Sequence, residues 1–193
     1  MAELKNILQR IENIFKSVDL KYIIVGGVTI IHYGHVRTTT DIDIILENKP
    51  SEFGKFINIL KKNDFDVMED QFFQGIKEGT NITIFDNKSY FRLDLKIANN
   101  NRENILLDKA IMKELFDSNL LIPSLEDVLV GKILYIGNIE DIPYSELLEY
   151  QDIIDFLTLF HANEESINLK YLEEEIRNIG LELTFNKLLS IKL

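Results

Sequence analysis

The sequence predicts an α/β protein in two parts, a front half that mixes strands with helices and a back half made of helices. In the front half, short apolar segments with strand-like alternation are separated by segments of helical spacing. From Pro123 onward, apolar residues recur only at helical spacing. The charge changes at the same place, from 18 acids and 16 bases in residues 1–122 to 14 acids and 5 bases in residues 123–193. We therefore expect one domain over residues 1–120 and a helical domain over residues 121–193.

The first expected element is an amphipathic helix over about residues 3–18, because its apolar residues recur three and four positions apart. "KYIIV" follows as a short buried strand, which Gly26 and Gly27 interrupt. "VTIIHYG" fits a short helix that ends at Gly34. The polar segment "HVRTTT" is typical of a loop, and "DIDIILE" then alternates polar and apolar residues as a strand does.

Proline and serine at positions 50 and 51 are helix-start signals, so we expect a helix over about residues 51–63. "DFDVM" is a candidate strand, and residues 69–80 are expected to form a loop. "NITIF" and "YFRLDLKIA" fit two strands joined by the turn "DNKS". Residues 102–115 are expected to be helical, and "LFDSNLLIP" to be extended.

The back half is expected to hold three helices. "SLED" resembles a capping box and opens a helix that ends near Ile136. Residues 144–162 fit a second helix, and residues 168–180 fit a third. In the second, Asp152 and Asp155 lie three residues apart, a pattern that favours a solvent-exposed acidic stripe.

Composition and charge exclude several classes of protein. The chain has no cysteine, which excludes thiol catalysis and cysteine–zinc sites. Its net charge of −11 gives no counterion-release affinity for nucleic acid, so general DNA binding is disfavoured. The N-terminal segment lacks the apolar centre of a signal peptide, and no run of 18 apolar residues occurs. We therefore expect a cytoplasmic protein without a membrane partner.

Two aspartates inside an apolar strand are the strongest functional signal. Asp41 and Asp43 are two residues apart, so both carboxylates project from one face of the strand while Ile42 and Ile44 enter the core. Two charges about 6 Å apart repel by roughly 3 kcal/mol at an effective dielectric near 20. Asp94, between two leucines, repeats the pattern and can join the pair if its strand is a neighbour. Three such carboxylates suit magnesium or manganese.

The glycine pair complements the aspartates. A turn from strand through Gly26 and Gly27 to a helix lets the backbone approach a phosphate closely and directs the helix N-terminus toward it. The sequence therefore predicts a site for a metal ion and a phosphorylated ligand.

These residues together resemble the signature of the DNA polymerase β-type nucleotidyltransferase superfamily. The match consists of Gly26-Gly27, thirteen intervening residues, Asp41-Ile42-Asp43-Ile44, and Asp94 flanked by leucines, within residues 22–97. "GGVTIIHYGHVRTTTDIDI" is most similar to the AbiEii-like nucleotidyltransferases, many of which are toxins of type IV toxin–antitoxin systems. The resemblance implies the nucleotidyltransferase fold, a small mixed sheet flanked by helices and followed by a helical C-terminal domain.

The resemblance also implies an activity and roles. Asp41 and Asp43 would hold two Mg²⁺ or Mn²⁺ ions, and Asp94 would be a ligand or the base that activates the attacking hydroxyl. The enzyme would move a nucleoside monophosphate from an NTP such as ATP to a hydroxyl acceptor. The superfamily's usual Gly-Ser is Gly-Gly here, so backbone amides at Gly26 and Gly27 would contact phosphate.

Four further residues are candidates for nucleotide binding. Arg37 would either bind the triphosphate or pair with the strand aspartates to steady its loop, and Thr40 would line the site. Lys132, inside an apolar helix, is either an edge residue with its amine in solvent or a triphosphate-binding cation, which the resemblance favours. The resemblance also places an acidic site residue near Asp152.

The sequence leaves the acceptor open. A toxin-like enzyme would modify a tRNA 3′ end or a protein side chain, and the acidic back half would suit a basic antitoxin partner. The alternatives are an inactive nucleotide-binding or toxin-partner module, and an enzyme that modifies an antibiotic or another small molecule. The complete set of three aspartates argues against the inactive module.

Overall fold

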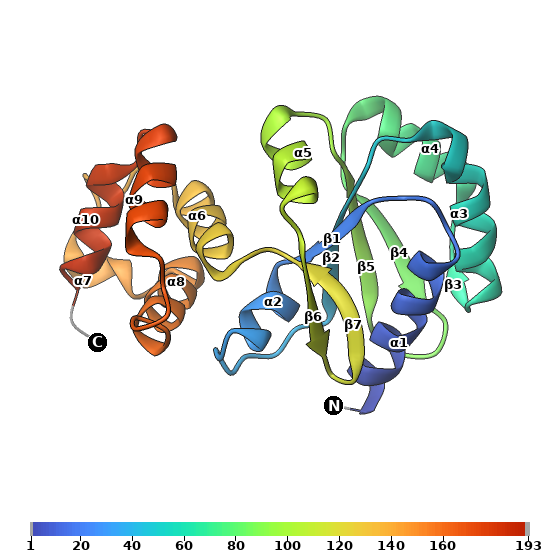
Figure 1. Cartoon of the computed structure of the whole chain (residues 1–193), viewed down its shortest axis with the longest axis horizontal. Coiled ribbons are helices and arrows are strands. Elements are labelled where there is room, and N and C mark those ends of the chain that lie inside the picture. Colours follow the sequence, from blue (N-terminus) through green and yellow to red (C-terminus); the bar gives the residue numbers. More distant parts are fainter. Residues whose placement is uncertain (1, 192–193) are drawn as a thin grey trace. The chain divides into compact units, whose positions relative to one another are not determined.

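The computed structural model describes residues 2–191 and divides the chain into two compact units (Figure 1). The first unit comprises Met1–Thr29 and Arg37–Pro123, and the second comprises Ile30–Val36 and Ser124–Leu193. The chain passes from the first unit to the second within helix α2 (Gly27–His32).

The first unit is built on a five-stranded mixed sheet. Strands β2 and β5 are parallel, and the other neighbouring pairs are antiparallel. The strands lie in the order β1 (Tyr22–Val25), β2 (Asp41–Leu46), β5 (Arg92–Ile97), β4 (Ile82–Asp86) and β3 (Phe65–Asp66). The predicted fold class, a small mixed sheet flanked by helices, is confirmed.

Four helices flank this sheet: α1 (Ala2–Lys16), α3 (Pro50–Lys62), α4 (Glu69–Glu78) and α5 (Asn101–Asp108). Aromatic rings from α1, α3 and α4 meet in one cluster, in which Phe56 lies 5.6 Å from Phe15 and 6.4 Å from Phe72 between ring centroids. Helix α5 packs instead against β1 and β2, near Ile23 and Ile45. Because side chains alternate along β2, Ile45 shares its sheet face with Asp41 and Asp43.

The segment expected to be a loop, residues 69–80, forms helix α4, so that prediction was wrong. The buried residues of this helix are Phe72 and Gly75, so its buried face is small. Phe72 is fully buried and packs edge-on against Phe53 at 5.8 Å. Tertiary packing therefore stabilises this helix, which Gly79 ends in a left-handed conformation.

The helix expected over residues 102–115 is also wrong in its second half. Helix α5 ends at Asp108, and strand β6 (Ile111–Leu115) pairs antiparallel with β7 (Ser118–Ile122). In the turn between them, Phe116 and Asp117 have positive φ, a conformation that is uncommon for residues other than glycine. The sequence therefore gives no clear sign of this turn. Pairing with β7 therefore overrides the helical preference of residues 111–115.

The second unit is helical. Its helices are α6 (Leu125–Ile136), α7 (Tyr144–Leu147), α8 (Gln151–Ala162), α9 (Leu169–Asn178) and α10 (Glu182–Leu189). Ser124 caps α6 as expected, since its Oγ accepts a hydrogen bond from the Asp127 backbone N–H at 3.1 Å. The apolar faces meet in one core, in which Phe156, Phe160 and Phe185 pack together.

The single helix expected over residues 144–162 is divided into α7 and α8. Leu147 and Ile153 are both buried in the same core. In one continuous helix they would point about 120° apart at 100° per residue. The extended backbone of Tyr150 lets both side chains enter the core. Helix α10, for which the sequence predicted no element, adds Phe185 and Leu188.

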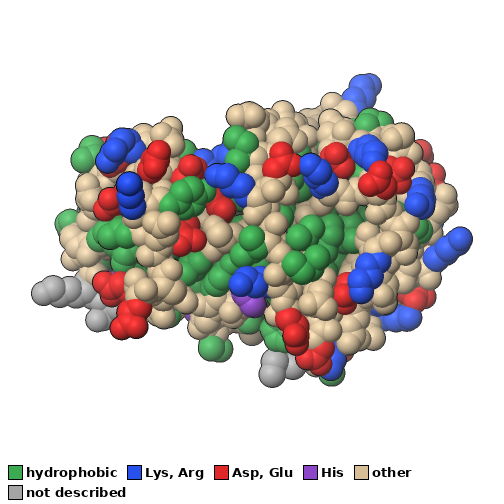
Figure 2. All heavy atoms as spheres, in the orientation of Figure 1, with side chains coloured by type: hydrophobic (Ala, Val, Ile, Leu, Met, Phe, Trp, Pro, Cys, Tyr) green, Lys and Arg blue, Asp and Glu red, His purple; other side chains and the backbone are tan. Residues whose placement is uncertain are grey.

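Two surface features bear on partners. No helix among residues 2–191 is long and apolar enough to cross a membrane. On the face shown in Figure 2, lysine and arginine side chains are scattered among acidic ones rather than gathered in a basic patch.

Candidate active site

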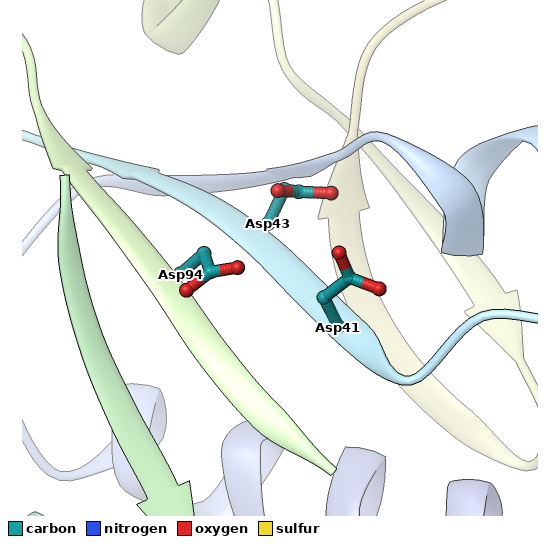
Figure 3. A group of neighbouring side chains, drawn as sticks. All are labelled: Asp41, Asp43 and Asp94. Carbon is teal, nitrogen blue, oxygen red and sulfur yellow. The ribbon is translucent and has the colours of Figure 1, made fainter.

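The three predicted aspartates lie together on one face of the sheet. Strands β2 and β5 are neighbours, and Asp43 stands directly beside Asp94 in the parallel register. One carboxylate oxygen from each of Asp41, Asp43 and Asp94 lies within 4.8 Å of the others, and Figure 3 shows the three groups on the same side of the strands. Ile42, which lies between the two aspartates of β2, and Ile44, which follows them, are buried on the opposite face.

The chemistry of this donor set fits a divalent cation. All three side chains are only partly buried, and each offers a charged oxygen. Oxygen ligands at this spacing suit a hard cation such as Mg²⁺ or Mn²⁺, which would also neutralise part of their mutual repulsion. The three aspartates are therefore the residues that could hold a metal here.

The first glycine of the pair makes room for Asp43. Gly26 has a φ of +67°, which L-residues rarely adopt, and a Cβ built on it would lie 2.0 Å from Asp43 Oδ2. No side chain fits there while Asp43 keeps its position. Besides any phosphate contact, Gly26 is thus needed to seat one of the aspartates.

The second glycine acts similarly on the neighbouring loop. A Cβ on Gly27 would lie 2.6 Å from Thr39 Oγ1. The Thr39 hydroxyl in turn lies 3.0 Å from the Asp41 carbonyl oxygen and 3.2 Å from Asp41 Oδ1, both of which can accept its proton. Close packing of Thr39 on Gly27 therefore positions Asp41. Thr39 belongs to the segment "HVRTTT", whose polar composition is typical of a loop and does not indicate this contact.

Two other residues at the site were missed from the sequence. Arg92 Nε donates to Asp94 Oδ2 at 3.1 Å, and its Nη2 lies 3.5 Å from Asp41 Oδ2. Thr83 lies on β4 directly opposite Asp94 on β5, and its hydroxyl donates a hydrogen bond to Asp94 Oδ1 at 2.6 Å. Arg92 could have been found, because it precedes Asp94 by two residues and must share its strand face. Thr83 could not, because its position depends on strand pairing.

Arg37 and Thr40 lie in the segment between α2 and β2. The Thr40 backbone N–H donates to Asp41 Oδ1 at 3.2 Å, and its carbonyl accepts a hydrogen bond from the Arg92 backbone N–H. Arg37 Nε is 3.5 Å from the carbonyl oxygen of Thr38. The predicted roles of both in nucleotide binding remain predictions.

Lys132 and Asp152 belong to the second unit, where they contact each other. Lys132 Nζ lies 2.7 Å from Asp152 Oδ1 and 2.7 Å from Asp155 Oδ2. Asp155 is fully buried, with Gln151 Nε2 at 2.9 Å and His35 Nδ1 at 3.1 Å from its Oδ1. The expectation that Asp155 lies on a solvent-exposed stripe was wrong, because these partners compensate a buried charge.

The comparisons with known proteins show the fold and the family of this chain. The fold resembles that of an antigenic nucleotidyltransferase-like protein from Paracoccidioides brasiliensis, with TM-score 0.55 and 16% identity over 100% of this chain and 94% of that one. It also resembles the fold of the antibiotic-resistance factor ANT(2″)-Ia, with TM-score 0.51 and 13% identity over 93% of this chain and 94% of that one. No curated protein matches. The family model described as "Nucleotidyltransferase of unknown function (DUF6036)" matches residues 2–187, and the chain belongs to this family of nucleotidyltransferases.

Proposed function

We propose that this protein is a metal-dependent enzyme that transfers a nucleoside monophosphate from an NTP to a hydroxyl acceptor. The observation that carries the proposal is the set of Asp41, Asp43 and Asp94, held on one sheet face within 4.8 Å of one another. Such a set is costly to maintain without a ligand, because like charges at this distance repel. The family match supports the general class of reaction.

In the proposed reaction, the acceptor oxygen forms a bond to the α-phosphorus while the bond to the bridging α–β oxygen breaks. Pyrophosphate leaves, and the hydroxyl proton passes to Asp94 or through it to water. Asp94 suits this role, because Thr83 fixes its orientation and its side chain is 16% exposed. Two divalent ions bound by the three aspartates would neutralise the triphosphate and lower the pKa of the attacking hydroxyl.

We assign the triphosphate to the loop beside these carboxylates. The backbone amides of Gly26 and Gly27, with Arg37 and Thr40, are the groups of the first unit proposed to contact it. Lys132 and Asp152 of the second unit are the other two residues that we propose for nucleotide binding, as the resemblance implies. The ion pair between them means that Lys132 keeps a charged partner before any nucleotide binds.

The proposed acceptor is a tRNA 3′ end or a protein hydroxyl, with the enzyme acting as the toxin of a toxin–antitoxin pair. An antitoxin would be a basic protein that binds the acidic second unit, in which residues 123–193 carry 14 acids and 5 bases. A small-molecule acceptor is the second candidate, because an antibiotic-resistance factor shares the fold.

One experiment separates these acceptors. The purified protein is incubated with each α-³²P-labelled NTP and MgCl₂, together with total tRNA, cell protein, or a panel of antibiotics. We expect label on tRNA or protein, and none with Asp43→Asn. Label on an antibiotic would favour the small-molecule acceptor over tRNA or protein. Incorporation nowhere, with every NTP, would contradict the proposed reaction.

A further inference from the structure

Arg92 contacts two of the residues proposed to hold a metal ion. Its guanidinium contacts two of the three aspartates, through Nε to Asp94 Oδ2 at 3.1 Å and Nη2 to Asp41 Oδ2 at 3.5 Å. Arg92 therefore compensates part of the negative charge that the three carboxylates concentrate here.

The contacts also occupy both oxygens of one aspartate. Asp94 Oδ1 accepts the Thr83 hydroxyl at 2.6 Å, while Oδ2 accepts Arg92. A divalent ion that binds Oδ2 together with Asp41 would come within a few ångströms of the guanidinium, and two cations at that distance repel strongly. The Arg92 side chain is 45% exposed, so it can rotate into solvent without opening the core.

We propose that Arg92 is the resident counter-cation of the aspartate set, which it holds in place until a divalent ion displaces it. Arg92 is then a positioning residue that competes with metal. The inference rests on the proposed function, because it takes the three aspartates as the metal ligands. The neutral hydroxyl of Thr83 can keep its bond to Asp94 Oδ1 in both states, which preserves the orientation of the carboxylate.

Competition predicts two opposite effects of one substitution. Arg92→Gln should bind Mn²⁺ roughly tenfold more tightly than wild type, a factor that corresponds to about 1.4 kcal/mol. The same variant should melt at a lower temperature in chelator, because the carboxylates lose their compensating charge. Arg92→Lys keeps the charge and should stay within about threefold of wild-type affinity. A merely structural residue would lower stability without raising metal affinity.

The test is a calorimetric titration of MnCl₂ without nucleotide, alongside thermal melts in chelator. Arg102→Gln, an exposed arginine of α5, is the matched control and should equal wild type in both measurements. Equal or weaker Mn²⁺ binding by Arg92→Gln would overturn this inference alone. If Arg92→Gln does not fold, the Mn²⁺ affinity of Arg92→Lys provides the test. A large loss of Mn²⁺ affinity in Arg92→Lys would contradict competition by charge. Wild type that binds no Mn²⁺ would overturn the metal site as well.

Discussion

Replacing Gly26 by alanine is the sharpest single perturbation of the site. The new Cβ would lie 2.0 Å from Asp43 Oδ2, 2.8 Å from its Cγ and 3.2 Å from its Cβ. Heavy atoms do not approach so closely, so the Asp43 side chain must leave its position or the backbone must shift. Either change removes one carboxylate from the set of three.

Two terms set the cost in stability. Alanine at a φ of +67° costs about 1–2 kcal/mol, because its Cβ crowds the following carbonyl. Forcing Asp43 off its rotamer adds about 0.5–1.5 kcal/mol. The effect on catalysis should be much larger, since a displacement of about 1 Å in a reacting group can cost on the order of 100-fold in rate.

A second glycine provides the control for backbone strain. Gly79, in the same unit, has the same φ of +67°, but a Cβ there meets only Asn99 Nδ2, at an ordinary 3.6 Å. We expect both alanine variants to lose the strain term in thermal melts, with Gly26→Ala losing about 0.5–1.5 kcal/mol more. Only Gly26→Ala should lose nucleotidyl transfer and Mn²⁺ affinity. If Gly26→Ala transfers nucleotide as well as Gly79→Ala does, Asp43 is not needed in its observed position and the assignment of the site is wrong.

Three further predictions concern charge. Asp43→Asn should abolish transfer yet melt no lower than wild type in chelator, because it relieves repulsion; a much lower melting temperature would make Asp43 structural. Arg10→Met should lower stability by about 3–5 kcal/mol in denaturant titrations, because it leaves the buried Asp86 unpaired, whereas Lys5→Met, at an exposed pair, should cost under about 1 kcal/mol. Burial raises the pKa of Asp86, but hydrogen bonds from Arg10 and Ser89 outweigh it and hold that pKa below its ordinary value. The stability that this pair contributes is therefore present above the ordinary pKa of an aspartate and is lost as pH falls through the lowered pKa of Asp86. The free energies of unfolding of wild type and Arg10→Met should therefore converge in acid. ATP should bind more tightly with Mg²⁺ than with chelator in calorimetric titrations, and equal affinities would count against a metal-bridged site.

The parts of the fold that could be predicted from sequence have strong local signals. Strand β2 alternates in burial along its whole length, and Ser124 caps α6 through its own side chain. Helix α4 depends on Phe72 entering a cluster formed by α1 and α3, which no local pattern contains. The β6–β7 hairpin likewise depends on a turn with two non-glycine residues at positive φ.

The site, too, has residues that the sequence predicts and contacts that depend on the pairing of distant strands. The three aspartates could be proposed from period-two alternation, because the flanking isoleucines and leucines fix which face each carboxylate takes. The parallel pairing that places Asp43 beside Asp94 joins strands distant in sequence, so the contact of Arg92 with Asp41 could not be predicted. The contact of Thr83 with Asp94 depends on the antiparallel pairing of β4 with β5, and the packing of Gly26 against Asp43 depends on that of β1 with β2.

The central claim is that these aspartates catalyse attack on the α-phosphorus of an NTP. The direct measurement compares transfer of label from α-³²P and γ-³²P NTP by wild type and Asp94→Asn, with Mg²⁺ and with chelator, and with Asp66→Asn as an exposed-aspartate control. The account predicts transfer of the α label only, dependent on Mg²⁺, lost in Asp94→Asn and retained in Asp66→Asn. Transfer of the γ label, or undiminished α transfer by Asp94→Asn, would contradict it.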